Sequence, residues 1–152
     1  MDIRRADLKD VEKILSLDRK WKREGVSWGI VVSSQKERKK QIKKNIVYIA
    51  EDRGKTIAYI EGEVIKSERK RPAYEIKKGE KYGELHSIYI INKYRREGLG
   101  KKMVENLLKE FKKNKVKKVL LKAVNKDLSR LVKFYKKFGF KERIVDMVKE
   151  MK

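Results

Sequence analysis

The chain has 152 residues, with 44 Lys and Arg against 22 Asp and Glu, which gives a formal net charge of +22. A chain of this length suits one domain, because single domains cluster at about 100–150 residues. The lack of cysteine excludes disulfides and a cysteine nucleophile, and the single histidine, His86, excludes any site that needs two imidazoles. We therefore expect one domain over residues 1–152, without a metal.

Nothing in the sequence points to a membrane. The first residues lack the apolar run of a secretory signal, and no stretch approaches the roughly 18 apolar residues of a membrane span. We therefore expect a cytoplasmic protein without a membrane partner. Asn and Gln are scarce and 43% of residues are charged, a composition typical of heat-adapted proteins. The charge favours polyanionic partners but does not choose among them.

The first half of the chain predicts a strand, two helices and a hairpin. In order we expect a strand at 2–5, a helix after the N-cap Asp7, a loop at 25–30, a helix from Ser33 or Ser34 to about 44, and strands at 46–51 and 56–66. Leu8 is expected on the apolar face of the first helix. Around Glu61 and Glu63 polar and apolar side chains alternate, which predicts a sheet with one wetter face.

The second half predicts a crossover between parallel strands. In order we expect a charged surface loop at 67–81, a strand at 83–91, a turn at 92–98, an amphipathic helix at 99–113, a strand at 116–124, a helix at 127–138 and a closing strand at 139–151. The strand, helix and strand from 83 to 124 indicate a βαβ unit. The whole order predicts a mixed α/β domain.

The sharpest local feature is the turn between the strand at 83–91 and the helix at 99–113, where residues 95–100 read RREGLG. Gly98 and Gly100 let the backbone come close to a ligand. The N–H groups that open the next helix lack intrahelical partners and attract phosphate oxygens, to which Arg95 and Arg96 add charge. The glycines alone also suit an ordinary strand–helix turn, and the Walker pattern is absent.

Residues 88–100 read IYIINKYRREGLG and resemble the acetyl-CoA signature of the GCN5-related N-acetyltransferase (GNAT) superfamily, with Arg95, Gly98 and Gly100 at its three marked positions. Residues 134–140, FYKKFGF, are similar to a second motif of that family, and the order of elements also matches. The resemblance implies an α/β (α+β) fold with a mixed, mostly antiparallel, twisted sheet flanked by helices.

The same resemblance implies acetyl transfer from acetyl-CoA to a primary amine, by direct attack in a ternary complex and without a metal. The backbone of the strand would bind the pantetheine arm and the glycine turn the pyrophosphate. The family often has Asn where this chain has Leu128, so Asn125 is a displaced substitute. The implied cofactor-binding residues are Ile88, Tyr89, Ile90, Arg95, Arg96, Glu97, Gly98, Leu99, Gly100, Lys101 and Asn125.

Three side chains are candidate catalytic groups. Tyr135, in the second motif, is the expected proton donor to the departing CoA thiolate, because a phenol of pKa about 10 is protonated at neutral pH. Glu84 is the expected base for the amine, and His86, two residues along the same strand, is the alternative, with water alone a third. Each residue also has an interpretation without a catalytic role. Glu84 would be a solvated surface glutamate, His86 a structural histidine, and Tyr135 an aromatic residue that packs the helix onto the sheet.

The sequence indicates least about the acetyl acceptor. By resemblance, the first helices and their loop wall its pocket, which implicates Trp21 and Trp28, and the acceptor is a small-molecule or protein amine. Dimers are common among proteins that this sequence resembles, so a homodimer is one expected state. The alternative function is a basic nucleic-acid- or ribosome-binding module without catalysis, although aromatic residues do not interleave with its lysine clusters.

Overall fold

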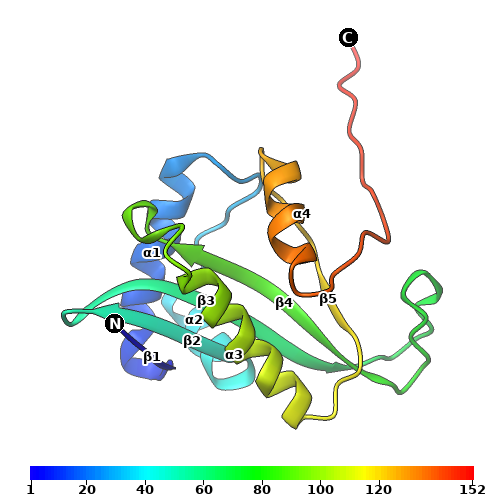
Figure 1. The fold of residues 1–152 in the computed structure, drawn as a ribbon, viewed down its shortest axis with the longest axis horizontal. Coiled ribbons are helices and arrows are strands. Elements are labelled where there is room, and N and C mark those ends of the chain that lie inside the picture. Colours follow the sequence, from blue (N-terminus) through cyan, green and yellow to red (C-terminus); the bar gives the residue numbers. More distant parts are fainter.

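The computed structural model describes residues 1–152 and contains a five-stranded sheet in the order β1-β2-β3-β4-β5 (Figure 1). Adjacent strands are antiparallel except β4 and β5, which are parallel and joined by α3. The predicted α/β (α+β) class, with a mostly antiparallel sheet and one βαβ crossover, is confirmed. The strands are β1 (Asp2–Arg5), β2 (Ile46–Asp52), β3 (Lys55–Lys66), β4 (Lys81–Ile90) and β5 (Val119–Leu121). The helices are α1 (Val11–Glu24), α2 (Gln35–Lys44), α3 (Leu99–Lys113) and α4 (Leu128–Lys136), with short 3-10 turns at Leu8–Asp10, Pro72–Tyr74 and Asn92–Tyr94.

Helices cover both faces of the sheet. In Figure 1, α3 lies in front of β2, β3 and β4, while α1 and α2 lie behind them. Met103, Leu107 and Phe111 of α3 are fully buried against one face, and Ile14 of α1 is fully buried against the other. The prediction of one wetter face on β3 was therefore wrong: Glu61 is only 4% exposed, because α2 covers the face that carries it.

The start of α1 is fixed by charged groups. Asp7 caps the 3-10 turn that leads into α1, as predicted, and Asp10 completes the capping box by accepting from the Asp7 N–H at 2.9 Å. Arg4 of β1 donates to both carboxylate oxygens of Asp10, at 2.8 and 2.9 Å. Leu8, expected on the buried face, is 45% exposed, because it lies in the 3-10 turn and not in the regular helix.

We expect Asp10→Asn to lower the free energy of unfolding by about 2 kcal/mol at pH 7. Burial raises the pKa of Asp10, but the hydrogen bonds from Arg4, the Asp7 N–H and Lys13 outweigh burial and lower it to about 2. A depressed pKa stabilises the fold above the unfolded-state value and loses this effect as pH falls through the folded value. In urea unfolding, the free energy of unfolding of Asp10→Asn should therefore be lower than that of the wild type at pH 7, and the difference should shrink between about pH 4 and pH 2. The exposed Asp2→Asn should unfold like the wild type, and an equal deficit at pH 2 and pH 7 would contradict the assignment.

An extra residue interrupts the ladder between β3 and β4. Glu61 pairs with Ser87 and Gly62 with Leu85, so His86 is a bulge in β4. Beyond it β4 and β5 separate, since β5 pairs only with Gly83–Leu85. The predicted fifth strand at 116–124 is shorter in the structure, Val119–Leu121, and the separation beyond the bulge accounts for its early end. The bulge leaves the β5-facing edge of the second half of β4 without a strand partner.

The predicted closing strand at 139–151 was wrong. Residues 139–152 form no helix or strand, and the segment runs away from the body of the molecule (Figure 1). Its last fixed points are an ion pair between Lys136 and Glu142 at 2.7 Å and a long 3.5 Å contact from Arg143 to the Ala73 carbonyl. A strand forms only where a partner edge is in reach, and the chain leaves that edge here. No helix of the structure is both long and apolar enough to cross a bilayer.

Candidate functional site

The glycine turn presents a row of free backbone donors. Arg96 and Gly98 adopt left-handed conformations, with φ of +67° and +83°, between the 3-10 turn Asn92–Tyr94 and the first residue of α3. The N–H groups of residues 96–101 donate to no atom of the protein. Successive free N–H groups at a helix N-terminus form an anion site, because their partial positive charges and the helix dipole point the same way. The turn therefore fits the pyrophosphate that the sequence predicts here.

Gly100 lets α3 begin close against β4 and α4. A Cβ at this position would lie 3.3 Å from Cδ1 of Ile90 and 3.4 Å from Cζ of Phe134. The start of α3 thereby lies beside the last residues of β4. A side chain at residue 100 would force these neighbours to shift by a few tenths of an ångström.

Arg95 has a structural contact that the sequence did not reveal. Its Nε donates to the Ile90 carbonyl at 2.7 Å and its guanidinium pairs with Glu24 at 2.7 Å. Glu24, the last residue of α1, also accepts from the Tyr89 hydroxyl at 2.5 Å. Arg95 therefore ties the turn to β4 and α1, so the free backbone and the exposed Arg96 and Lys101 are the groups left for phosphate.

The edge of β4 that faces the gap to β5 carries free backbone N–H groups. The Ile91 N–H donates to the Ile57 carbonyl of β3, and by alternation the N–H groups of Ile88 and Ile90 point the other way. Past Leu85 this outer edge has no strand partner. An extended polar chain can add there as a strand would, which is the contact expected for pantetheine.

Glu84 and His86 lie on the sheet face opposite α3. Leu85 packs in the core under α3, so its neighbour Glu84 points to the other face. His86 Nε2 lies 3.0 Å from an oxygen of Glu63, and Glu63 is the register partner of Glu84. The expected sharing of one face by Glu84 and His86 is therefore confirmed, although the bulge breaks the simple alternation.

Glu63 is a site residue to which the sequence analysis gave no catalytic role. Its carboxylate pairs with Lys44 at 3.0 Å as well as with His86. Burial raises its pKa, but the hydrogen bonds from Lys44 and His86 prevail and lower it. An ionised Glu63 orients the imidazole by accepting from Nε2, which leaves Nδ1 as the acceptor of a proton. The hairpin register of the strands at 56–66 and 83–91 is the only sequence signal that pairs Glu63 with this strand.

Tyr135 lies in the core on the α3 side. It is 6% exposed, its ring makes edge contacts with Phe134 and Phe140, and its hydroxyl makes no hydrogen bond within the protein. Burial raises its pKa to about 12, so the phenol keeps its proton at neutral pH. Phe134, its neighbour, also faces Gly100, so Tyr135 lies close in the chain to the wall of the glycine turn.

Asn125 lies in the loop before α4 and not on the helix. Its side-chain oxygen accepts from the Asp127 N–H at 2.8 Å, and its backbone bridges to Ser27 in the loop after α1. Only its amide NH₂ remains for a ligand. Trp21 stacks on Tyr89 at 5.5 Å between ring centroids, while Trp28 is 62% exposed beneath Lys126. The two predicted wall tryptophans therefore differ, since Trp21 supports β4 and Trp28 faces solvent.

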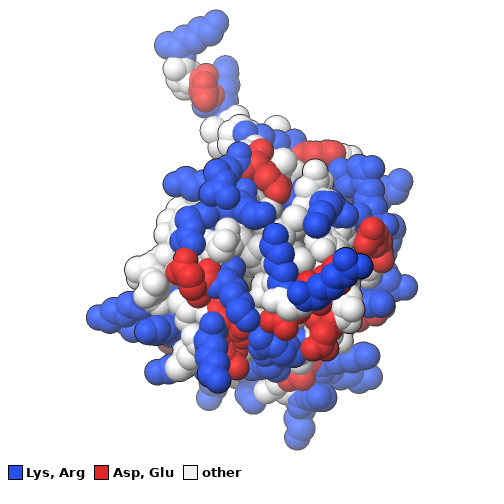
Figure 2. Space-filling view, turned by 90° about the vertical axis from the view of Figure 1, so that its left-hand side faces the viewer, with Lys and Arg blue, Asp and Glu red and all other residues white.

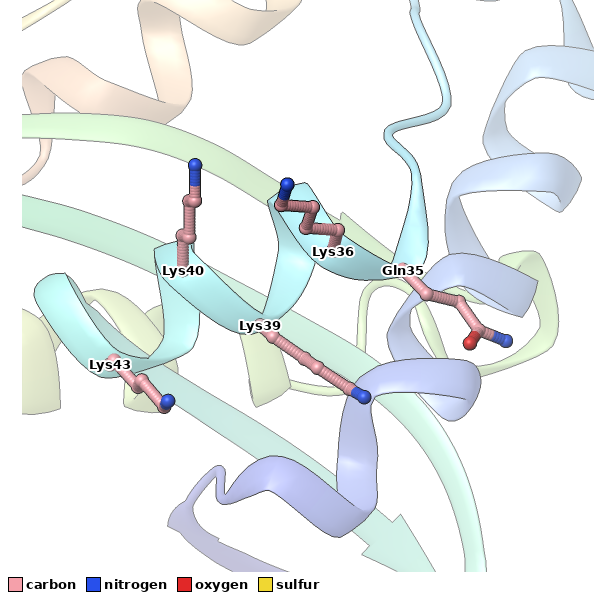
Figure 3. A pocket seen from close by; sticks show the side chains of 5 residues that line it. All are labelled: Gln35, Lys36, Lys39, Lys40 and Lys43. Carbon is pink, nitrogen blue, oxygen red and sulfur yellow. The ribbon is translucent and has the colours of Figure 1, made fainter.

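A lysine-lined hollow on α2 contains none of these groups. Figure 3 shows the side chains of Gln35, Lys36, Lys39, Lys40 and Lys43 along one side of the helix. The lining contains no acid, nucleophile or imidazole, so it can attract anions but offers no catalytic group. Positive side chains also spread over the face in Figure 2, with acidic ones between them. On this face the positive charge is therefore spread out and not gathered in one patch.

The sequence model of the Acetyltransferase (GNAT) family matches residues 12–140. That range contains the glycine turn, the gap between β4 and β5, and the second motif. The chain belongs to the GNAT family. No curated protein matches the chain.

Solved GNAT-like structures share the fold over nearly the whole chain. A predicted acetyltransferase with acetyl-CoA from Clostridium acetobutylicum is 27% identical, with a TM-score of 0.70, over 99% of this chain and 95% of the other. An aminoglycoside acetyltransferase from an uncultured soil metagenomic sample is 16% identical, with a TM-score of 0.74, over 99% and 96%. A ribosomal-protein-alanine N-acetyltransferase from Brucella melitensis is 14% identical, with a TM-score of 0.69, over 99% and 100%. At their low identity, the last two show the fold alone.

Proposed function

We propose that this GNAT protein is an acetyl-CoA-dependent N-acetyltransferase that acts on a primary amine by direct attack in a ternary complex. The observation that carries the proposal is the row of free N–H groups at residues 96–101, next to the free edge of β4. The row suits a pyrophosphate, and the edge suits an amide-containing arm. The two together match the chemistry of CoA better than that of a simple phosphate.

The chain's residues would hold the donor in two places. Backbone N–H groups from Arg96 to Lys101 bind the pyrophosphate, and Ile88 and Ile90 pair with the pantetheine arm. Acetyl-CoA supplies an acetyl group activated as a thioester. The gap between β4 and β5 then gives the amine access from the face that carries Glu84 and His86.

An alkyl amine has a pKa of about 10.4 and must lose a proton before it can attack. The carboxylate of Glu84 and Nδ1 of His86 are the two groups on that face able to take this proton, directly or through water. The contact with Glu63 favours His86 as the base. A carboxylate oxygen of Glu63 lies 3.0 Å from Nε2 of His86 and orients the imidazole, which leaves Nδ1 free. The backbone of Glu84 lies in the sheet between β3 and β5, but its side chain makes no hydrogen bond or ion pair within the protein, so its carboxylate is also available.

We expect Tyr135→Phe to lower kcat about 100-fold while the Kd for acetyl-CoA changes less than two-fold. The phenol donates its proton to the departing sulfur, whereas phenylalanine keeps the ring contacts with Phe134 and Phe140. Steady-state kinetics and calorimetry measure the two quantities. Tyr48→Phe, which removes a hydroxyl bound to Glu110, is the matched control and should keep kcat. An unchanged kcat in Tyr135→Phe, with chemistry rate-limiting, would remove Tyr135 from the mechanism.

The acceptor is proposed as a class, a small-molecule or protein amine. Structures with this fold include an aminoglycoside acetyltransferase and a ribosomal-protein-alanine N-acetyltransferase, which represent both classes. A net charge of +22 repels polycationic amines at long range, which favours acceptors with few charges or an acidic protein. A screen of small amines and peptide N-termini for release of free CoA thiol identifies the acceptor.

Calorimetric titration with CoA tests the proposal as a whole, and we expect a Kd in the micromolar range or tighter. The lysine-lined hollow of α2 favours a second candidate function, the binding of a nucleic acid backbone. A short RNA duplex is therefore titrated in parallel at two salt concentrations. RNA binding with a steep salt dependence and no CoA binding would overturn the enzyme proposal.

A further inference from the structure

Lys44, the last residue of α2, differs from the other lysines of that helix. Its Nζ pairs with a carboxylate oxygen of Glu63 on β3 at 3.0 Å. The other lysines of the helix are exposed and line the hollow seen in Figure 3: Lys36, Lys39, Lys40 and Lys43. Lys44 does not line that hollow. One lysine of α2 is therefore held at the sheet by an acidic side chain.

Glu63 joins Lys44 to the candidate base. One carboxylate oxygen of Glu63 lies 3.0 Å from Nε2 of His86, and the other lies 3.0 Å from Nζ of Lys44. Other lysines of the chain also form ion pairs, but none of their acidic partners contacts a candidate catalytic group. Lys44 is therefore the one ion-paired lysine that a single carboxylate separates from a candidate base.

The backbone of Lys44 is fixed, whereas its side chain is free to change conformation. Ile42 and Asn45, on either side of it in the chain, are both 8% exposed, and the Asn45 side-chain amide donates to Glu61 at 2.6 Å. The side chain of Lys44 is 74% exposed, and its one ion pair is the contact with Glu63. A long, flexible side chain on a fixed backbone can leave an ion pair for a nearby reactive group without any change in the fold.

The reactive end of acetyl-CoA would lie at the same place. In the proposed binding mode the pyrophosphate lies at residues 96–101, and the pantetheine arm follows β4 past Ile90 and Ile88. Farther in that direction the arm reaches His86, where the bulge separates β4 from β5. The thioester at the end of the arm therefore comes to the strand position that carries the candidate base.

We propose that Lys44 is a modification site, and that the enzyme transfers an acetyl group from acetyl-CoA to Nζ of its own Lys44. The inference rests on the proposed function, because it uses the same donor and the same base. A primary alkyl amine is the acceptor class of that reaction. Lys44 presents such an amine beside His86, on the face of the sheet that also carries Glu84.

The transfer replaces a carbon–sulfur bond with a carbon–nitrogen bond. Nδ1 of His86, or the carboxylate of Glu84, takes the first proton from the Lys44 ammonium, directly or through water. The neutral Nζ then bonds to the acetyl carbon while the bond from that carbon to sulfur breaks. Tyr135 gives the sulfur a proton, and the second proton of Nζ replaces it. The products are acetyl-lysine and the free CoA thiol.

Acetylation of Lys44 changes the contacts of the candidate base. An amide replaces the ammonium, so the ion pair between Lys44 and Glu63 is lost. His86 is then the only side chain that pairs with Glu63. The modification therefore acts on the carboxylate that orients the imidazole.

Peptide mass spectrometry of the full chain, after incubation with acetyl-CoA and no added amine, tests the assignment. Cleavage after glutamate releases residues 38–51, a peptide that contains Lys39, Lys40, Lys43 and Lys44. We expect acetylation of Lys44 to be about 10-fold faster than that of its exposed neighbour Lys43, because only Lys44 is held beside the base. The rate constant should not depend on protein concentration, since the base and the amine belong to one chain. Equal labelling of the two lysines, or a rate constant that rises with protein concentration, would overturn the proposal.

Three variants separate a catalysed transfer from chemical labelling in solution. Gly98→Glu, which weakens CoA binding, and Glu63→Gln, which removes the charge that holds Lys44 and His86, should each lower the labelling of Lys44 to the level of Lys43. Lys43→Arg is the matched control and should leave the rate at Lys44 unchanged. An unchanged rate at Lys44 in Glu63→Gln would contradict the inference.

The proposed function has a separate readout. CoA binding by calorimetry and the release of CoA thiol with an added amine are measured on the same preparation. Acetylation of an added amine without preferential labelling of Lys44 would overturn this inference and leave the proposed function in place. Absence of CoA binding would overturn both.

Discussion

Gly98→Glu is expected to raise the Kd for CoA at least 100-fold. The substitution puts a carboxylate among the free N–H groups of residues 96–101, where a pyrophosphate would sit. At a separation of about 4 Å and partial exposure, two like charges repel by several kcal/mol, and about 2.7 kcal/mol already corresponds to 100-fold. Calorimetric titration with CoA, supported by a competition assay for the weak variant, measures the change.

Gly79→Glu is a closely matched control. Gly79 has φ of +84° against +83° for Gly98, and neither has an atom within 4 Å of an added Cβ. Both variants therefore pay the same backbone strain, about 1–2 kcal/mol, and gain the same charge. Gly79 lies in the loop between β3 and β4, away from the glycine turn. The Kd of Gly79→Glu for CoA should therefore differ less than two-fold from that of the wild type. Equal loss of affinity in both variants would mean that the turn does not bind the phosphates.

Arg38→Ala is expected to lower the free energy of unfolding by about 3–5 kcal/mol. Arg38, on α2, is 4% exposed and pairs with Glu61 of β3 at 2.8 Å and with Asp18 of α1 at 2.6 Å. Burial lowers the pKa of Arg38, but the two carboxylates outweigh it and raise the pKa. Without the guanidinium, two buried carboxylates lose their counter-charge, and Asn45 and Tyr59 donate the only remaining bonds to them. Urea unfolding at pH 7 measures the loss.

Two further variants test whether the unpaired charges cause this loss. Lys39→Ala, on the exposed side of the same helix, should change stability by less than about 0.5 kcal/mol. The triple variant Arg38→Met/Asp18→Asn/Glu61→Gln removes all three charges and should recover most of the stability that Arg38→Ala loses. If the triple variant is as unstable as Arg38→Ala, packing and not charge explains the loss.

The charge network under α2 and the bulge at His86 lay outside what sequence patterns reveal. A charged residue on a basic helix is normally solvated, and nothing local distinguishes Arg38 from the exposed lysines beside it. It is buried because α1 and β3 bring Asp18 and Glu61 to the same point. The link from Arg95 to Glu24 spans 71 residues and has the same origin. Such contacts depend on which elements are neighbours, and a linear pattern does not encode that.

The sequence by itself determined the local elements and the glycine turn. Apolar residues at helical spacing after Gly98 gave α3 its bounds of 99–113, because these contacts lie within a few residues of one another. The tertiary structure decided which strands and side chains became neighbours. It buried both faces of β3, joined Glu63 to His86, separated β4 from β5 after the bulge and left the expected last strand unpaired. A strand needs a neighbouring edge, and only the folded chain decides whether that edge is within reach.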